Sequence, residues 1–460
     1  MVFSSIFFVF RFVVLFFALY YIMPYKYKNL VITVFSLIFY SWGEFRYFPI
    51  MLATILINYI CSLIIEKKRE SKAVANVSLA VAAVFSLGML FFFKYADFFI
   101  RNINSFTGLK IGTIGLSLPL GISFYTFQTL SYTIDVWRNK TAAEKNIINF
   151  AAFVTMFPQL IAGPIVKYTD ISDKLNTYKG RYNLQGINEG IKLFVFGLAK
   201  KVLISNNVGM LWDDVQAIGF ANVSTPLAWL GIVAYALHIY FDFSGYSLMA
   251  IGMGKMMGFD FPDNFNLPYI SKSITEFWRR WHMTLGGWFR EYVYIPLGGN
   301  RKGMARQIFN MFVVWFLTGF WHGAEWNFMF WGLYYFVLLV LEKTFLLKIL
   351  EKHSVFARFY TLFAVVIGWA IFAVTDLSQL GLFFTKLFSF TGGVSVAYYI
   401  KNYGISLVIA ILCSTSLTTK IYKKIKDNNA VIIPVVIALF VICTAYMVDS
   451  TYNPFIYFRF

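Results

Sequence analysis

The chain has 460 residues, of which 59% are apolar, 20% are aromatic and only 13% are charged. Soluble globular proteins carry about 25% charged residues, so this composition excludes a water-soluble fold, whose surface would be apolar almost everywhere. The net charge of +18 indicates loops that orient a membrane protein rather than a nucleic-acid partner. The composition therefore predicts an integral membrane protein.

The uncharged runs of the sequence, taken in chain order, predict about ten to twelve membrane spans, since a helix needs about 20 largely uncharged residues to cross a bilayer. A weaker candidate at 187–205 is interrupted by lysines. The uncharged runs cover residues 12–25, 29–43, 47–65, 73–93, 111–134, 146–166, 215–241, 307–324, 326–341, 359–375, 402–419 and 428–448.

Two of these runs are poor candidates for straight helices. The run 111–134 contains Gly115, Pro119 and Gly121, and the run 146–166 contains Pro158 and Pro164. Broken backbone at membrane depth is tolerated only inside protein or beside a water-filled cavity. We therefore expect re-entrant or kinked segments that line an interior funnel, with ordinary kinked spans as the alternative.

The distribution of lysine and arginine predicts the orientation of the chain. With the N-terminus outside, the basic clusters at 26–28, 67–72, 343–358 and 420–426 and the basic segment 252–306 all lie in the cytoplasm, as the positive-inside rule requires. The same count leaves the tail 449–460 extracytoplasmic. The first apolar run lacks a cleavage site typical of signal peptides and is expected to remain as a membrane helix.

Few residues in the sequence can perform acid–base chemistry. The three cysteines are widely spaced in apolar runs and fit neither a disulfide framework nor a zinc site, so no bound metal is expected. Among four histidines, His353 lies in a basic loop, and His238 precedes Asp242 by one helical turn as a structural pair. His322 ends an uncharged run and is a functional candidate, although a packed structural histidine is equally consistent with its position.

His282 lies in the stretch ITEFWRRWHMTLGGWFREYVYIPLGGNR, which predicts an amphipathic helix at the cytoplasmic interface. In this interpretation Trp278, Trp281 and Trp288 anchor the helix in the interface. The arginines of the stretch contact either anionic lipid headgroups or the phosphates of a donor such as coenzyme A. These arginines are Arg279, Arg280 and Arg290.

Long strings of this sequence resemble the membrane-bound O-acyltransferase family, in its alginate O-acetyltransferase branch. The densest match is IYFDFSGYSLMAIGMGKMMGFDFPDNFNLPYISKSITEFWRRWHMTLGGWFREYVYIPLGGNR (Ile239–Arg301), followed by LTGFWHGAEWNFMFWGLY. The resemblance implies that His322 is the family's catalytic histidine and His282 its second characteristic polar residue. Leu248 departs from the aspartate found in many relatives, and His238 stands where relatives often have glutamine.

The resemblance implies an all-α polytopic membrane protein, with a ring of about ten to twelve helices and re-entrant segments around a thin central funnel. Residues 1–460 are expected to form one membrane domain, with a catalytic core at 239–342. Acetyl-CoA would be the acyl donor substrate, and no cofactor would stay bound. An exported SGNH-type, esterase-like partner would complete transfer to an extracytoplasmic polysaccharide.

The C-terminal sequence NPFIYFRF resembles the terminal motif of a small companion of the related D-alanyl transferase. By this resemblance Tyr457 is a candidate acyl relay, while an interfacial aromatic anchor is the simpler alternative. Two other functions remain open at this point. One is transfer of D-alanine or another acyl group to teichoic acid, and the other is a non-enzymatic transporter or export subunit.

Overall fold

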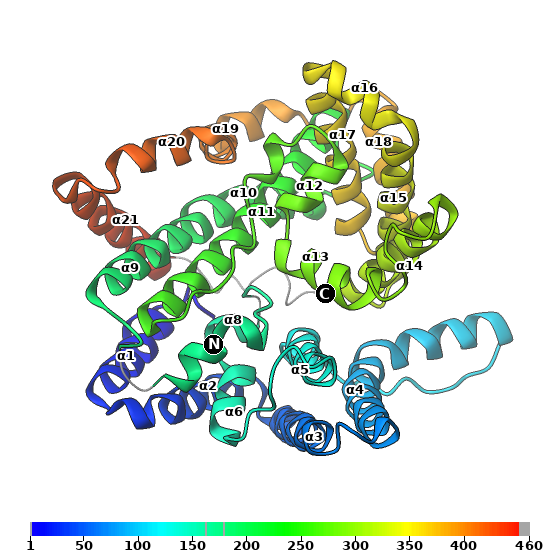
Figure 1. Ribbon diagram of the computed structural model, residues 1–460. Coiled ribbons are helices and arrows are strands. Elements are labelled where there is room, and N and C mark those ends of the chain that lie inside the picture. Colours follow the sequence, from blue (N-terminus) through cyan, green and yellow to red (C-terminus); the bar gives the residue numbers. More distant parts are fainter. Residues whose placement is uncertain (1, 162, 178–179, 450–460) are drawn as a thin grey trace. The chain divides into compact units, whose positions relative to one another are not determined.

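The computed structural model describes residues 2–161, 163–177 and 180–449 of the chain (Figure 1). These residues form helices joined by irregular segments, and the only strand-like pairing among them is an isolated parallel bridge between Val223 and Val394. The prediction of an all-α protein is confirmed. Tyr457 lies outside the described residues.

Two compact units make up the chain. Unit 1 contains Met1–Phe194 and Ser247–Pro262, and unit 2 contains Val195–Tyr246 and Asp263–Phe460. The long helix α11 (Thr225–Met257) contributes residues to both units, and so does α9 (Leu184–Ala199).

In unit 1, α3 packs against α4 and α5, and α2 packs against α6. Pro49 stands in the first turn of α3, where its missing N–H costs no hydrogen bond. Besides the shared α9 and α11, the α-helices of this unit are α1 (Val13–Ile22), α2 (Lys28–Glu44), α3 (Phe48–Lys67), α4 (Lys72–Thr107), α5 (Ile122–Trp137), α6 (Ile147–Thr155), α7 (Phe157–Leu160) and α8 (Tyr168–Asn176).

Unit 2 holds both histidines of the predicted site. Its π-helical segments η4 (Lys200–Ser205), η6 (Arg290–Tyr294) and η7 (Glu342–Leu346) are continuous with neighbouring α-helices. The α-helices of this unit, besides α9 and α11, are α10 (Asn206–Ile218), α12 (Ile274–Arg280), α13 (Met283–Phe289), α14 (Met304–His322), α15 (Trp326–Leu341), α16 (Leu347–Lys352), α17 (Ser354–Ala373), α18 (Leu377–Phe388), α19 (Val396–Cys413), α20 (Ser416–Ile425) and α21 (Asn429–Asp449).

Within the described residues, six helical segments are long and apolar enough to cross a membrane. The chain is therefore a multi-pass membrane protein. Other uncharged runs form shorter or less apolar helices, so the total of ten to twelve spans stays a prediction. The six segments are Tyr25–Lys67, Lys72–Thr107, Thr225–Met257, Ser354–Ala373, Val396–Cys413 and Asn429–Asp449.

Both runs that were expected to be broken are broken. Residues 108–119 form no helix, and α5 begins only after Gly121, whose φ of 71° lies in the left-handed region. A Cβ atom at Gly121 would lie 2.6 Å from the carbonyl oxygen of Leu160, so the turn requires glycine. The second run divides into α6 and α7 at Met156. The funnel that these segments were expected to line stays a prediction.

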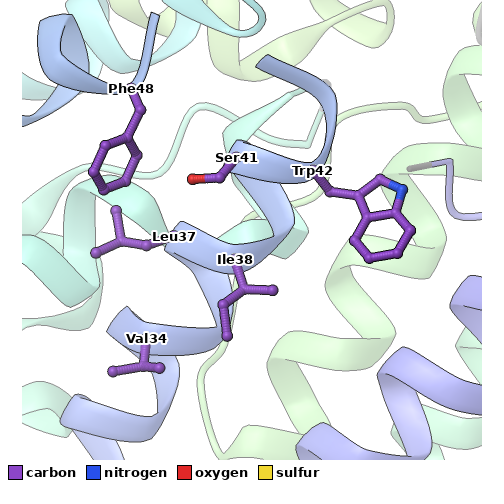
Figure 2. A pocket seen from close by; sticks show the side chains of 6 residues that line it. All are labelled: Val34, Leu37, Ile38, Ser41, Trp42 and Phe48. Atoms are coloured by element: carbon purple, nitrogen blue, oxygen red, sulfur yellow. The ribbon is translucent and has the colours of Figure 1, made fainter. Parts of the chain in front are cut away.

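A groove of about 470 Å³ lies on α2 and the first residue of α3 in unit 1 (Figure 2). Its lining is apolar except for one hydroxyl group and the indole nitrogen. No lining side chain has a carboxylate, imidazole or amine, so this groove supplies no acid or base. The lining residues are Val34, Leu37, Ile38, Ser41, Trp42 and Phe48.

Candidate active site

The hairpin of α14 and α15 carries His322 at the end of its first helix. The two helices pack closely because glycines face the partner backbone: a Cβ atom at Gly319 would lie 2.3 Å from the carbonyl oxygen of Phe328. A Cβ atom at Gly332 would lie 2.4 Å from the carbonyl oxygen of Trp315. Small residues of this kind let membrane helices approach closely. Because Gly319 lies one turn before His322, this contact also fixes the position of the histidine.

Replacing Gly319 with alanine is expected to destabilise the protein by about 1–3 kcal/mol, because the new methyl group overlaps backbone that cannot easily move. Gly381 in α18 is a matched control, since a Cβ atom there meets nothing within 4 Å. Gly381→Ala is expected to be neutral or to stabilise by up to about 1 kcal/mol through helix propensity. Thermal denaturation of both variants in one detergent measures the difference, and equal stabilities would contradict the close approach.

The imidazole of His322 lies among aromatic rings and is 7% exposed. The ring centroids of Trp331 and Phe372 lie 5.0 and 5.3 Å from that of His322, both nearly perpendicular to it. Trp331 belongs to α15 and Phe372 to α17. His322 is therefore held in a largely apolar environment built from three helices.

His282 lies at a break between α12 and α13, where the sequence indicated one continuous amphipathic helix. Its φ of 45° is left-handed, a conformation that costs a non-glycine residue about 1–3 kcal/mol. The Nδ1 atom lies 3.0 Å from Oδ1 of Asn264. The ring is 3% exposed, and this burial lowers the pKa of His282 to about 3. The imidazole is therefore neutral at pH 7.

The predicted interfacial anchors are mostly buried in unit 2, so that interpretation is wrong. Trp281 and Trp288 are 2% and 5% exposed. Trp278 packs against Trp315 and Tyr335, with ring centroids 4.9 and 4.8 Å apart. Trp278 and Trp281 lie in the protein core because α12 packs against α15 and α17. Trp288 packs against Phe289 and Tyr292.

A buried carboxylate fixes the start of α12. Glu342, 1% exposed, accepts hydrogen bonds from the backbone N–H groups of Ile274 at 2.6 Å and Thr275 at 2.8 Å. It also accepts the Thr275 hydroxyl at 2.7 Å. A negative charge at a helix N-terminus is favourable, so Glu342 anchors the segment that leads to His282.

The side chain of Trp321 connects the two histidines. Its ring centroid lies 4.9 Å from that of His322 and 6.1 Å from that of His282. Two imidazoles far apart in the sequence thus contact one indole in a buried part of unit 2. Both histidines that the sequence predicted thus border the same indole, and acid–base chemistry is what imidazole side chains can supply.

Comparison with known proteins identifies the family of the chain. The sequence profile of the membrane-bound O-acyltransferase family matches residues 5–385. The chain belongs to this family. It is therefore an O-acyltransferase of the membrane, and the helices from α19 onward lie beyond the matched residues.

Three relatives illustrate the range of the family. A probable alginate O-acetylase AlgI of Pseudomonas syringae pv. tomato is 41% identical over 395 residues, which cover 85% of this chain and 76% of that protein. A peptidoglycan O-acetyltransferase of Helicobacter pylori is 32% identical over 82% of this chain and 78% of its own length. A teichoic acid D-alanyltransferase of Streptococcus thermophilus is 30% identical over 52% of this chain and 60% of its own.

The three arginines proposed for donor binding differ in their surroundings in this O-acyltransferase. Arg280 forms an ion pair of 2.9 Å with Glu276 and donates to the carbonyl oxygen of Asn266 at 3.0 Å. Its guanidinium is thus already engaged within the chain. Arg279 and Arg290 are exposed, and their role in donor binding stays a prediction.

His238 belongs to a buried network rather than to the active site. Ser205 Oγ lies 3.0 Å from His238 Nδ1 and donates to Asp242 Oδ1 at 3.4 Å. Lys201 forms an ion pair of 2.5 Å with the same carboxylate, and their side chains are only 3% and 0% exposed. This network joins η4 to α11, which is a structural role.

Sequence reasoning missed Asn264, Glu342 and Trp321. Trp321 directly precedes His322 in the sequence. This position was the only feature that could have indicated its place in the site. Asn264 and Glu342 accept hydrogen bonds from the starts of α13 and α12, which are distant from them in the sequence. No local sequence pattern indicates such a contact. Among the described residues, no group of three or more histidine, cysteine, aspartate or glutamate side chains could hold a metal ion.

Proposed function

We propose that this O-acyltransferase transfers an acetyl group from cytoplasmic acetyl-CoA for O-acetylation of an extracytoplasmic polysaccharide. The observation that carries the proposal is the contact of His282 and His322 with the same buried indole, Trp321. The similarity to alginate and peptidoglycan O-acetylating relatives over more than four fifths of the chain supports acetyl as the acyl group.

His322 acts as the general base in this proposal. It takes the proton from a hydroxyl group while the hydroxyl oxygen attacks the thioester carbonyl. One C–O bond forms, the C–S bond breaks, and the leaving thiolate takes the proton from the imidazolium. The histidine returns to its neutral form, so no further reactant is needed.

His282 and the arginines serve the donor in this proposal. Neutral His282 positions or polarises the acyl donor, and the exposed Arg279 and Arg290 attract the phosphates of coenzyme A. Arg280 contributes positive charge while it remains paired with Glu276. By the positive-inside rule these arginines face the cytoplasm, and the N-terminus and the tail 449–460 are extracytoplasmic.

The acetyl group leaves the protein by way of Tyr457 and an exported SGNH-type partner. The phenol oxygen of Tyr457 is the first acceptor, and the partner moves the acetyl group onto the polysaccharide. The resemblance of the C-terminal NPFIYFRF motif to that of an acyl-relaying companion protein supports this order of transfer. The acceptor is an exopolysaccharide or a cell-wall polymer.

Intact-protein mass spectrometry after incubation with acetyl-CoA tests the donor and the relay together. We expect one acetyl adduct on the wild type and none on Tyr457→Phe or His322→Ala. An adduct that persists on Tyr457→Phe would contradict the relay. If no chain is modified by acetyl-CoA but the wild type accepts D-alanine from a carrier protein, the acetyl assignment is wrong.

A further inference from the structure

The hydrogen bonds around Asn264 determine which nitrogen of His282 carries the proton. Asn264 is 1% exposed, and its Oδ1 atom lies within hydrogen-bond distance of three groups. These are His282 Nδ1 at 3.0 Å, the backbone N–H of Thr284 at 3.3 Å and the hydroxyl of Thr284 at 2.9 Å. Three groups thus converge on a single side-chain oxygen.

The Thr284 backbone group settles the orientation of the amide. A backbone N–H is only a donor, so the atom that faces it must be the carbonyl oxygen of Asn264 and not its NH₂ group. The oxygen is only an acceptor, so His282 Nδ1 must donate to it and must carry the proton. In a neutral imidazole the other nitrogen, Nε2, then has a lone pair.

The Nε2 atom of His282 is buried and has no hydrogen-bond partner among the described residues. Native proteins leave few buried polar atoms unsatisfied, and such atoms often mark a functional site. The lone pair of Nε2 is therefore not used by any hydrogen bond within the described residues.

Asn264 also fixes the backbone immediately after His282. Its carbonyl oxygen accepts the N–H of Met283 at 2.9 Å, while its side chain accepts the N–H of Thr284. The first two N–H groups of α13 are thus capped by one residue from a distant part of the chain. This cap stabilises the helix start immediately after the left-handed conformation of His282.

We propose that Asn264 is a positioning residue that fixes His282 with its proton on Nδ1, so that Nε2 accepts a hydrogen bond from the hydroxyl or thiol of an entering substrate. The identity of that substrate rests on the proposed function, but the tautomer does not. The two claims can therefore fail separately.

The tautomer is measured by NMR of the whole protein with ¹⁵N-labelled histidine. The chain has only four histidines, so the His282→Gln variant identifies the His282 signals by difference. We expect a protonated Nδ1 and an unprotonated Nε2 in the wild type at pH 7. A protonated Nε2 with a bare Nδ1 would overturn the proposal, whatever the transfer activity of the protein.

Three variants separate positioning from general stability. Asn264→Asp keeps the acceptor oxygen, so Nδ1 of His282 is expected to stay protonated. Asn264→Leu removes the acceptor, so a population of His282 with the proton on Nε2 is expected. Thr284→Val is the matched control, because it removes a hydrogen bond to the same oxygen without touching His282. A tautomer change in Thr284→Val as large as in Asn264→Leu, or none in Asn264→Leu, would overturn the proposal.

Transfer assays on the same variants keep the two claims distinguishable. If the wild type transfers no acetyl group but His282 has the expected tautomer, the proposed function fails and the role of Asn264 stands. If the wild type is active and Asn264→Leu retains full activity with a changed tautomer, the link between Asn264 and substrate binding is wrong.

Discussion

Replacing His322 with alanine is expected to lower the rate of acyl transfer by about 10²–10⁴-fold, the usual contribution of a general base. The fold is expected to survive, because the imidazole lies at the end of α14 and the neighbouring rings of Trp331 and Phe372 also pack against each other, with centroids 5.4 Å apart. The measurement is the rate of labelled acetyl transfer in membranes that contain equal amounts of wild-type and variant protein.

His353→Ala is the matched control for this prediction. His353 is exposed between α16 and α17, so its removal is expected to leave the transfer rate unchanged. Full activity of His322→Ala would show that the base is another group and would favour a non-enzymatic role for the site. Loss of the folded protein would be detected by denaturation in detergent before any rate is compared.

Replacing Asp242 with asparagine is expected to lower the free energy of unfolding by about 3–5 kcal/mol, because the change leaves the ammonium group of Lys201 buried without its carboxylate. Both side chains are almost fully buried, so water cannot replace the lost partner. Denaturation of the variant in detergent measures the effect. The double replacement Lys201→Met with Asp242→Leu removes both charges and is expected to recover most of the stability.

The ion pair of Lys255 with Asp260 is the exposed control for the buried pair of Lys201 with Asp242. The Asp260 side chain is 76% exposed and lies 3.4 Å from the lysine. Asp260→Asn is expected to change stability by about 0–1 kcal/mol. A similar small effect in Asp242→Asn would contradict a buried, tightly coupled network in unit 2.

The fold class and the two histidines could be predicted from the sequence because their signals are local. Uncharged runs reveal membrane helices directly, and His322 stands at the end of one of them. The breaks at Gly121 and Met156 followed from glycines and prolines inside apolar runs. The family resemblance implied catalytic roles for both histidines, which spacing alone left open and which stay predictions.

The surroundings of the histidines could not be predicted, because they come from distant segments. Nothing near His282 in the sequence shows that Asn264 caps α13 or that the expected helix is divided at His282. Trp281 was interpreted as an interfacial anchor because tryptophan favours the membrane interface. Its indole is instead stacked with Phe277, at a centroid distance of 5.6 Å, and packed on Trp369 at 4.8 Å.

The most direct test of the proposed function supplies membranes containing the wild-type chain and the proposed exported partner with acetyl-CoA labelled in the acetyl group. The label is then sought as base-labile ester on the extracytoplasmic polysaccharide. We expect labelled acetate from the wild type and at most about one hundredth of it from His322→Ala. Labelled ester at equal levels from both, or base-labile D-alanine in place of acetate, would contradict the account.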